Sequence, residues 1–335
     1  MSAARVLERL LQLPVVLFGV SLIVFLMMTL TPGDPVEIML ADQRATDEQA
    51  AMLRRDLGLD RPLVERYLVF LGNALTGDFG ISFFHRRPVF DVIAERLPAT
   101  IELTFVALLI AVAVAVPLGV AAAVRRDSWL DRALSALSLF GVSLPGFWFG
   151  ILLILLFSVQ LGLFPVGGRI PFGAEVPRLT GFLLIDTVAA GRPDGFLRAL
   201  SHLVLPAITL GLPAAALLAR VIRSSMVEVL ATDYVLFAEA KGLTRRRVLF
   251  LHALKNALIP AVTVLAIETG SLLGGSMIVE TVFGWPGLGR VVVESIFARN
   301  YPLVQAAILF YAVVYVLLNF CADLLYAVLN PKVRL

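Results

Sequence analysis

Cysteine and histidine are scarce in this sequence. One cysteine, Cys321, and three histidines occur among its 335 residues. A single cysteine cannot form an intrachain disulfide, and the histidines lack the H-E-x-x-H spacing that places two ligands on one helix face. We therefore expect no metal site, and we interpret Cys321 as a small buried hydrophobic residue.

Motifs for nucleotide binding and for hydrolysis are also missing. Neither G-x-x-x-x-G-K-[ST] nor G-x-S-x-G occurs. An intramembrane enzyme would need a base beside Ser143, Ser271 or Ser276, but His202 and His252 fall near the ends of apolar segments. The sequence thus predicts no catalytic residue, no cofactor bound by this chain and no nucleic-acid partner, so any ATP that is used must be bound by another chain.

Charge is the third scarcity. Charged residues make up 16% of the chain against 59% hydrophobic residues, and the mean hydropathy is +0.90, well outside the usual range of soluble domains. A membrane-spanning helix needs about 20 mostly apolar residues. Six segments qualify: 10–31, 99–124, 134–162, 201–223, 259–283 and 303–329. We predict an all-α polytopic membrane protein with six transmembrane helices in a lipid bilayer.

The positions of Lys and Arg predict the orientation. They gather before the first segment, between the second and third, between the fourth and fifth, and in the tail 330–335. Short basic loops stay in the cytoplasm, so both termini are predicted to be cytoplasmic. Residues 1–31 are interpreted as an N-terminal anchor and first transmembrane helix, because the run is long and no A-x-A cleavage site follows it.

The connector 32–98 is too long for the short-loop rule and is mildly acidic, with eleven Asp and Glu against eight Arg. We expect it outside the cytoplasm. Thr46 and Gln49 have capping-box spacing, Gly58 is expected to end that helix, and Pro62 to begin another. A small helical extracytoplasmic subdomain is predicted, whereas the Gly- and Pro-rich connector 163–200 gives no secondary-structure prediction.

Acidic residues inside apolar segments are costly and are candidate functional residues. Glu102 and Glu280 fall near predicted outer ends, where we expect hydration, which leaves Glu268 and Asp323 as the deeper pair. A stand-alone secondary transporter would use that pair for ion coupling, and this alternative stays open. Small residues beside Glu268 share a helix face that either packs closely against another helix or lines a pathway; they are Gly270, Ser271, Gly274 and Gly275.

The stretch 238–260 reads AEAKGLTRRRVLFLHALKNALIP. Thr232 or Asp233 can cap a short helix that Gly242 ends, and Thr244 can cap a second one. That second helix has an apolar face of Val248, Leu251, Leu254 and Leu258, and its other faces carry Arg245, Arg246, Arg247 and Lys255. Two interpretations remain: a loop that lies on anionic lipid, or a docking element for a cytoplasmic partner.

The same region resembles the EAA loop of ABC importer permeases, in the dipeptide, oligopeptide and nickel branch. Further blocks resemble that branch in order along the chain: TPGDP at 31–35, LTGDFGIS at 75–82, RLPATIEL at 96–103, SLPGFWFGILLI at 143–154, LGLFPVGG at 161–168, LVLPAITLGL at 203–212 and ETVFGWPGLG at 280–289. The sequence departs from the general pattern, since Leu236, Phe237 and Ala238 stand at the E-A-A positions, so Glu239 receives no motif role.

The resemblance implies a type I importer permease with a core at 99–329 that holds five transmembrane helices and a cytoplasmic coupling loop at about 224–258. The residues implied at the ATPase contact are Ala238, Ala240, Lys241, Gly242, Leu243 and Arg245. It also implies a multi-pass protein of the prokaryotic plasma membrane, a second and different permease subunit, two ATPase domains that bind ATP and Mg, and an extracytoplasmic binding protein. The implied substrate is a di- or oligopeptide, with nickel, glutathione and sugars as alternatives.

Overall fold

The computed structural model describes residues 3–30, 36, 40, 46–56, 58–171, 173 and 176–329, and within them all regular elements are helical. Five helices are long and apolar enough to cross a membrane. They are α1 (Ala3–Leu30), α5 (Val89–Val124), α9 (Pro193–Leu230), α12 (Leu254–Val282) and α14 (Tyr301–Leu329). These helices confirm five of the six predicted spans, including the fifth, which is continuous despite its glycines and glutamates.

The third predicted span, 134–162, is not one helix. The chain forms α6 (Trp129–Ser143), α7 (Gly146–Leu153) and the π-helix η1 (Ile154–Gln160) instead. The interruption falls at Leu144 and Pro145, and Pro145 adopts extended angles at the start of α7. Proline has no N–H to donate and disfavours a helical residue before it, so an apolar run of sufficient length is divided in two.

Close contact between α5 and α9 forms the centre of the molecule. A Cβ added to Gly211 would lie 2.6 Å from the backbone oxygen of Ala107, and one added to Gly119 would lie 2.9 Å from that of Ala219. Small residues on both helices therefore let the two backbones approach closely. Between helices in lipid, such close van der Waals packing takes the place of the hydrophobic effect. Alanines of α5 and α9 are numerous in the largest cluster of buried apolar residues, which lies around this contact.

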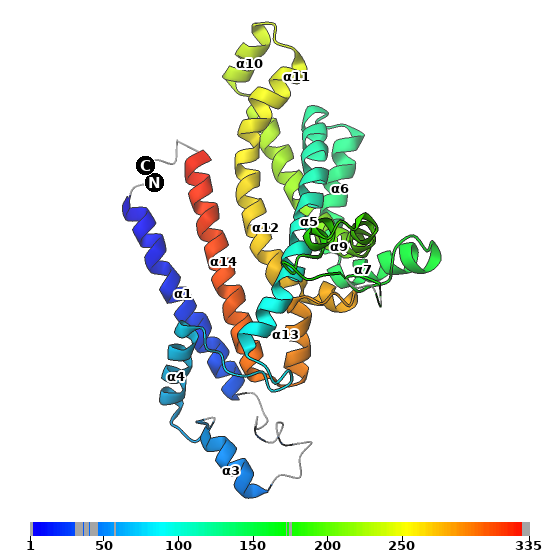
Figure 1. Cartoon of the computed structure of the whole chain (residues 1–335). Coiled ribbons are helices and arrows are strands. Elements are labelled where there is room, and N and C mark those ends of the chain that lie inside the picture. The colour runs from blue at the N-terminus through cyan, green and yellow to red at the C-terminus, as the bar shows by residue number, and fades with distance from the viewer. Residues whose placement is uncertain are drawn as a thin grey trace.

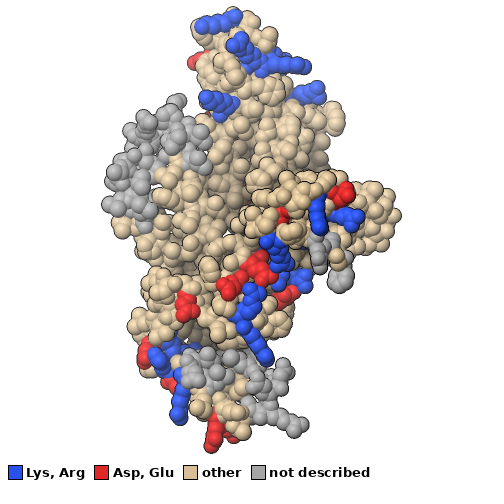
Figure 2. Space-filling model, in the orientation of Figure 1, with Lys and Arg blue, Asp and Glu red and all other residues tan. Residues whose placement is uncertain are grey.

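Different helices lie at the two ends of the helix bundle (Figure 1). The start of α1, the end of α14 and the hairpin of α10 (Asp233–Ala240) and α11 (Arg245–Arg247) lie towards one end, and α3 (Asp47–Asp56) and α4 (Leu63–Thr76) lie at the other. On the visible face, a broad uncharged surface lies next to the basic hairpin, and charged side chains gather from the middle of one side down to the opposite end (Figure 2). This uncharged surface has the character expected of a surface in contact with lipid.

The helical connector has the predicted local signals. The Thr46 N–H donates to Gln49 Oε1 at 3.0 Å, and the Gln49 N–H donates to Thr46 Oγ1 at 3.4 Å, which completes the capping box before α3. Gly58 has a positive φ of 65° after α3, and Pro62 precedes α4. The side chains of α4 reach α1, where Tyr67 and Ser21 share a hydrogen bond of 2.8 Å. The block 31–35 and the tail 330–335 lie outside the described residues.

Candidate functional site

The basic stretch forms a helix–turn–helix hairpin, as predicted. α10 ends at Ala240, Gly242 turns the chain with a φ of 76°, and α11 begins at Arg245. The Gly242 N–H donates to the Glu239 oxygen at 2.9 Å, which is typical of a left-handed helix end. Thr232 and Thr244 occupy the N-cap positions, but neither side chain makes a capping hydrogen bond.

A small core holds the two arms of the hairpin together. Val235, Ala238 and Val248 are buried against one another, and Leu243 packs against this cluster. Ala238 and Leu243, which the resemblance places at the ATPase contact, are thus interior or partly interior residues of the hairpin. Their side chains fix the angle between the arms.

The outer surface of the hairpin is apolar, aromatic and basic. Ala240, Lys241, Gly242 and Arg245 are all exposed, and basic side chains cover this end in Figure 2. Large apolar side chains share the surface; they are Tyr234, Leu236, Phe237, Phe250 and Leu251. Of the predicted apolar face, Val248 is buried and Leu251 is exposed, because the helix passes through the π-helical turn η2 (Val248–Ala253), which changes the register of its faces.

The hairpin is a direct extension of two long helices. Only Ala231 and Thr232 separate α9 from α10, and α11 continues through η2 into α12 without a break. Asn256 of α12 donates a hydrogen bond of 2.8 Å to the Tyr234 hydroxyl of α10. The hairpin is therefore connected to α9 by a two-residue link and to α12 by continuous helix and by this hydrogen bond.

A second set of polar residues lies at the other end of the core, around Glu280. The Glu280 side chain is fully buried. Its Oε1 accepts hydrogen bonds from the Thr100 hydroxyl at 2.8 Å and the Ser276 hydroxyl at 3.1 Å, and its Oε2 accepts the Arg290 N–H at 2.9 Å. The Arg290 N–H belongs to the first turn of α13 (Leu288–Phe297), where the helix dipole favours a negative charge.

The chain folds closely around this carboxylate. A Cβ added to Gly287 would lie 2.5 Å from the Glu280 carboxylate, so only glycine fits there. Trp285 donates its ring N–H to the Ala99 oxygen at 2.9 Å, and the Leu288 N–H donates to the Thr100 hydroxyl at 2.8 Å. The block 280–289 is therefore fastened to the block 96–103.

Glu102 organises the neighbouring connector. It is 6% exposed, and its carboxylate accepts hydrogen bonds from Arg169 Nη2 at 2.6 Å and from the Leu184 N–H at 2.8 Å.

Asp186 of α8 (Leu183–Ala189) accepts hydrogen bonds from the Thr180 N–H at 2.8 Å and from the Gly181 N–H at 3.0 Å. Burial raises the pKa of Asp186, but these hydrogen bonds outweigh burial and hold that pKa below its usual value.

A short strap joins the connector to the Glu280 region. The Gly168 N–H donates to the Phe283 oxygen at 2.8 Å, and His202 Nδ1 lies 2.9 Å from the Gly167 oxygen. A Cβ added to Gly167 would lie 2.3 Å from the Phe283 oxygen. The three quoted blocks 96–103, 161–168 and 280–289 therefore meet in space, and we call this region the carboxylate cluster: Thr100, Glu102, Arg169, Ser276 and Glu280.

The expectation that water relieves Glu102 and Glu280 is wrong, because hydroxyls, backbone N–H groups and Arg169 surround them. The sequence shows that these acids lie near segment ends, but it does not show that α13 and residues 167–184 fold over them. A long connector that returns over the core can bury a segment end as fully as the middle of a span.

The residues around Glu268 separate into two environments. Glu268 is half-buried, and no hydrogen-bond or ion-pair partner occurs for it among the described residues. A Cβ on Gly270 would lie 2.6 Å from the Tyr315 ring, so Gly270 packs against α14, whereas nothing lies within 4 Å of a Cβ on Gly274. Ser271 is exposed, and the side chains of Asp323 and position 275 lie outside the described part. Cys321 is exposed rather than buried.

The fold has a counterpart among solved structures. The chain shares the fold of a chain in the inward-facing MetNI methionine ABC transporter, with a TM-score of 0.50 and 20% identity, over 69% of this chain and 93% of that one. Helices suited to a bilayer, together with that fold, define the class of the chain as a polytopic α-helical membrane protein. More specifically, the chain belongs to the binding-protein-dependent transport system inner membrane component family, which matches residues 115–335, and its N-terminal counterpart matches residues 4–104.

Curated relatives match nearly end to end. The dipeptide transport system permease protein of Escherichia coli (strain K12) is 44% identical over 319 residues, or 94% of each chain. The di/tripeptide transport system permease protein of Pseudomonas aeruginosa (strain UCBPP-PA14) is 45% identical over 317 residues, 95% of this chain and 94% of that one. The glutathione transport system permease protein of E. coli O1:K1 / APEC is 41% identical over 329 residues, 98% of each chain.

Proposed function

We propose that this chain is the permease subunit through which an ATP-driven importer of the prokaryotic plasma membrane takes up di- or oligopeptides. The dipeptide and di/tripeptide relatives support the substrate class. Separate ATPase subunits bind ATP and Mg and hydrolyse the nucleotide, and an extracytoplasmic binding protein delivers the peptide. Glutathione, itself a small peptide, is the second candidate substrate because of the relative that carries that name.

The single observation that carries this proposal is the hairpin of α10 and α11. It lies beyond the uncharged surface and presents exposed aromatic and basic side chains (Figures 1 and 2). Exposed apolar patches of this kind mark protein interaction sites, and the hairpin continues into α9 and α12. We infer that an ATPase subunit binds it from the cytoplasm and moves both helices.

A second permease subunit completes the pathway. A stripe runs along α12 through the exposed residues Ile267, Ser271 and Ile278 and the half-buried Gly274. Such an open face with small residues at its centre suits close packing with another helix or a polar path between two subunits. We propose that the partner is a different permease chain.

The first experiment isolates the tagged chain in mild detergent and identifies the co-purifying proteins by mass spectrometry. An ATPase, a second permease and a secreted binding protein are the expected partners. The reassembled complex in proteoliposomes should take up labelled alanyl-alanine only when ATP is inside, and collapse of the proton gradient should not stop uptake. Uptake driven by a proton gradient without ATP would instead favour a stand-alone transporter that uses Glu268.

Gly242 tests the role of the hairpin. A Cβ at Gly242 would meet no atom of the described residues within 4 Å, so a long side chain obstructs a partner rather than the hairpin itself. Gly242→Ala and Gly242→Arg both incur the strain of a left-handed residue, about 1–2 kcal/mol. Gly242→Arg should abolish uptake with membrane insertion intact, and Gly242→Ala should retain most of it. Equal uptake by the two variants at equal expression would contradict the docking role.

A further inference from the structure

An ion pair fastens α6 to α9 near the hairpin. The Asp131 carboxylate on α6 accepts hydrogen bonds from Nε and Nη2 of Arg223 on α9, the latter at 2.6 Å, and also from the Asp127 N–H at 3.0 Å. The Asp131 side chain is 4% exposed and that of Arg223 is 30% exposed. A partly buried, bidentate pair of this kind is among the stronger polar contacts in proteins and fixes the direction of both side chains.

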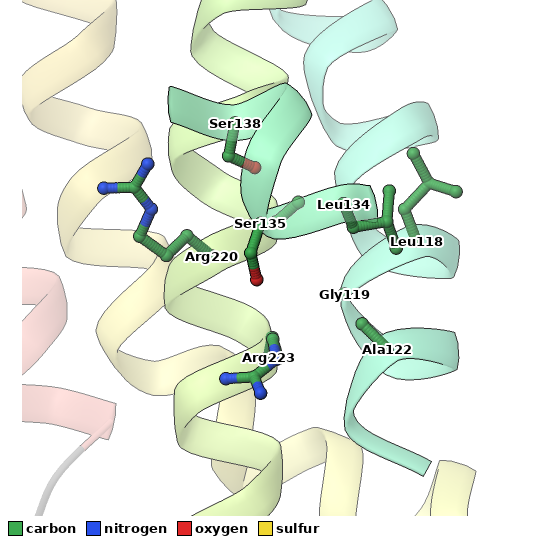
Figure 3. A pocket seen from close by; sticks show the side chains of 9 residues that line it. Leu118, Gly119, Ala122, Leu134, Ser135, Ser138, Arg220 and Arg223 are labelled. Atoms are coloured by element: carbon green, nitrogen blue, oxygen red, sulfur yellow. The ribbon is translucent and has the colours of Figure 1, made fainter. Parts of the chain in front are cut away.

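Beyond this pair, two open pockets line α6. The first has a volume of about 300 Å³ and lies among α5, α6 and α9, and Ser135 and Ser138 of α6 and Gly119 and Ala122 of α5 contribute to its lining (Figure 3). A second cavity of about 320 Å³ extends along α6 to Leu144. Side chains that line a cavity forgo part of their dispersion contacts. The ion pair is thus the charged contact at the start of a helix that two open pockets border along its next turns.

The ion pair lies between the hairpin and the strap along the chain. Arg223 lies about two turns before α9 ends at Leu230, and α10 follows at Asp233. From Asp131 the chain passes through α6, α7 and η1 to the strap, where Gly168 is bonded to Phe283. A displacement of the hairpin that moves the end of α9 also moves Arg223, and through Asp131 it draws α6 along.

We propose that Asp131 and Arg223 are positioning residues for coupling: the pair makes α6 follow α9, so that motion of the hairpin reaches the strap. Without the pair, α9 moves while α6 stays in place beside its cavities. This inference rests on the proposed importer function, because it assigns a transmission role to residues that contact neither ATP nor peptide.

The test uses the full complex in proteoliposomes, with uptake of labelled alanyl-alanine and ATP hydrolysis measured in the same sample. Asp131→Asn should lower uptake per ATP about tenfold, within the usual range of coupling energies. Arg223→Lys, which keeps the charge but loses the two-pronged donor, should lower it less. The exchange Asp131→Arg with Arg223→Asp should restore part of the ratio. Glu65→Gln, in the exposed Arg61–Glu65 pair, is the control and should leave the ratio unchanged.

The ratio of peptide uptake to ATP hydrolysis distinguishes a loss of coupling from a loss of folded protein. A merely structural role lowers uptake and ATP hydrolysis in parallel and keeps their ratio at the wild-type value, which would overturn the proposal. If Asp131→Asn fails to assemble, the ratio in Arg223→Lys decides by the same criterion. Absence of ATP-dependent uptake in the wild-type complex would contradict the importer function itself, whereas a coupled wild type with unaltered variant ratios would contradict only the role of the pair.

Discussion

The Thr100 hydroxyl donates a hydrogen bond of 2.8 Å to Glu280 Oε1, although the two residues are 180 positions apart in the chain. The same hydroxyl oxygen accepts the Leu288 N–H at 2.8 Å. A hydroxyl both donates and accepts, so Thr100 joins α5, α12 and the start of α13 with one side chain.

Thr100→Val should destabilise the protein. The substitution keeps the shape but leaves the Leu288 N–H without its acceptor and Glu280 with one donor fewer, at a cost of about 1–3 kcal/mol for each unsatisfied group. Thermal unfolding of the detergent-solubilised protein measures the effect. Thr104→Val is the matched control one turn further on, because the buried Thr104 hydroxyl has no hydrogen-bond partner in the described structure. An equal loss of stability in both variants would contradict the assigned contacts.

Glycine at position 289 should be irreplaceable, whereas glycine at position 274 should not be. A Cβ on Gly289 would lie 2.7 Å from the Met277 Cα and 2.9 Å from Glu280 Oε2, but a Cβ on Gly274 meets nothing within 4 Å. Gly289→Ala forces apart α12 and α13, with an expected cost of about 1–3 kcal/mol. Gly274→Ala should be neutral or slightly stabilising in the isolated chain. The yield of monodisperse protein and its melting temperature should both fall in Gly289→Ala and stay near the wild-type values in Gly274→Ala.

Asp186 should contribute a pH-dependent part of the stability. Its pKa in the folded protein lies below its usual value of 3.8, so the contribution is present above that value and is lost as the pH falls through the folded pKa. Melting temperatures recorded from pH 6 to about pH 3 should therefore fall more steeply in the wild type than in Asp186→Asn. Parallel curves would show that the hydrogen bonds of Asp186 do not favour its ionised form.

Local signals in the sequence predicted local structure well. The capping box of Thr46 and Gln49, the turn at Gly242 and five long apolar helices all occur where the pattern places them. Each depends on residues close together in the chain. The division of the third span at Pro145 shows that hydropathy averaged over about 20 residues does not register a single proline that interrupts the hydrogen-bond ladder.

The carboxylate cluster could not be predicted from the sequence pattern. Glu280 is satisfied by Thr100, by Ser276 and by a backbone N–H of α13. Thr100 belongs to a segment 180 positions away, and the N–H of Arg290 reaches Glu280 only because the chain folds back at the start of α13. The order of the quoted blocks identified the segments but not that they meet. The predicted apolar face is divided for a related reason, since η2 shifts the helix faces by a fraction of a turn and leaves Val248 buried but Leu251 exposed.

Phe237 should contribute to partner binding and Val235 to folding of the hairpin. Phe237 is 61% exposed beside the Lys241 ammonium, which lies 4.5 Å from its ring centroid, whereas Val235 is 1% exposed within the hairpin core. Exposed aromatic side chains often supply about 2 kcal/mol or more at interfaces, which corresponds to roughly a 30-fold change in affinity. Phe237→Ala should therefore weaken co-purification of the ATPase subunit while the melting temperature of the isolated chain stays unchanged. Val235→Ala should lower the protection of hairpin amides against hydrogen exchange, because it opens the contact with Ala238 and Val248. Full retention of the ATPase by Phe237→Ala would place the docking surface on another side of the hairpin.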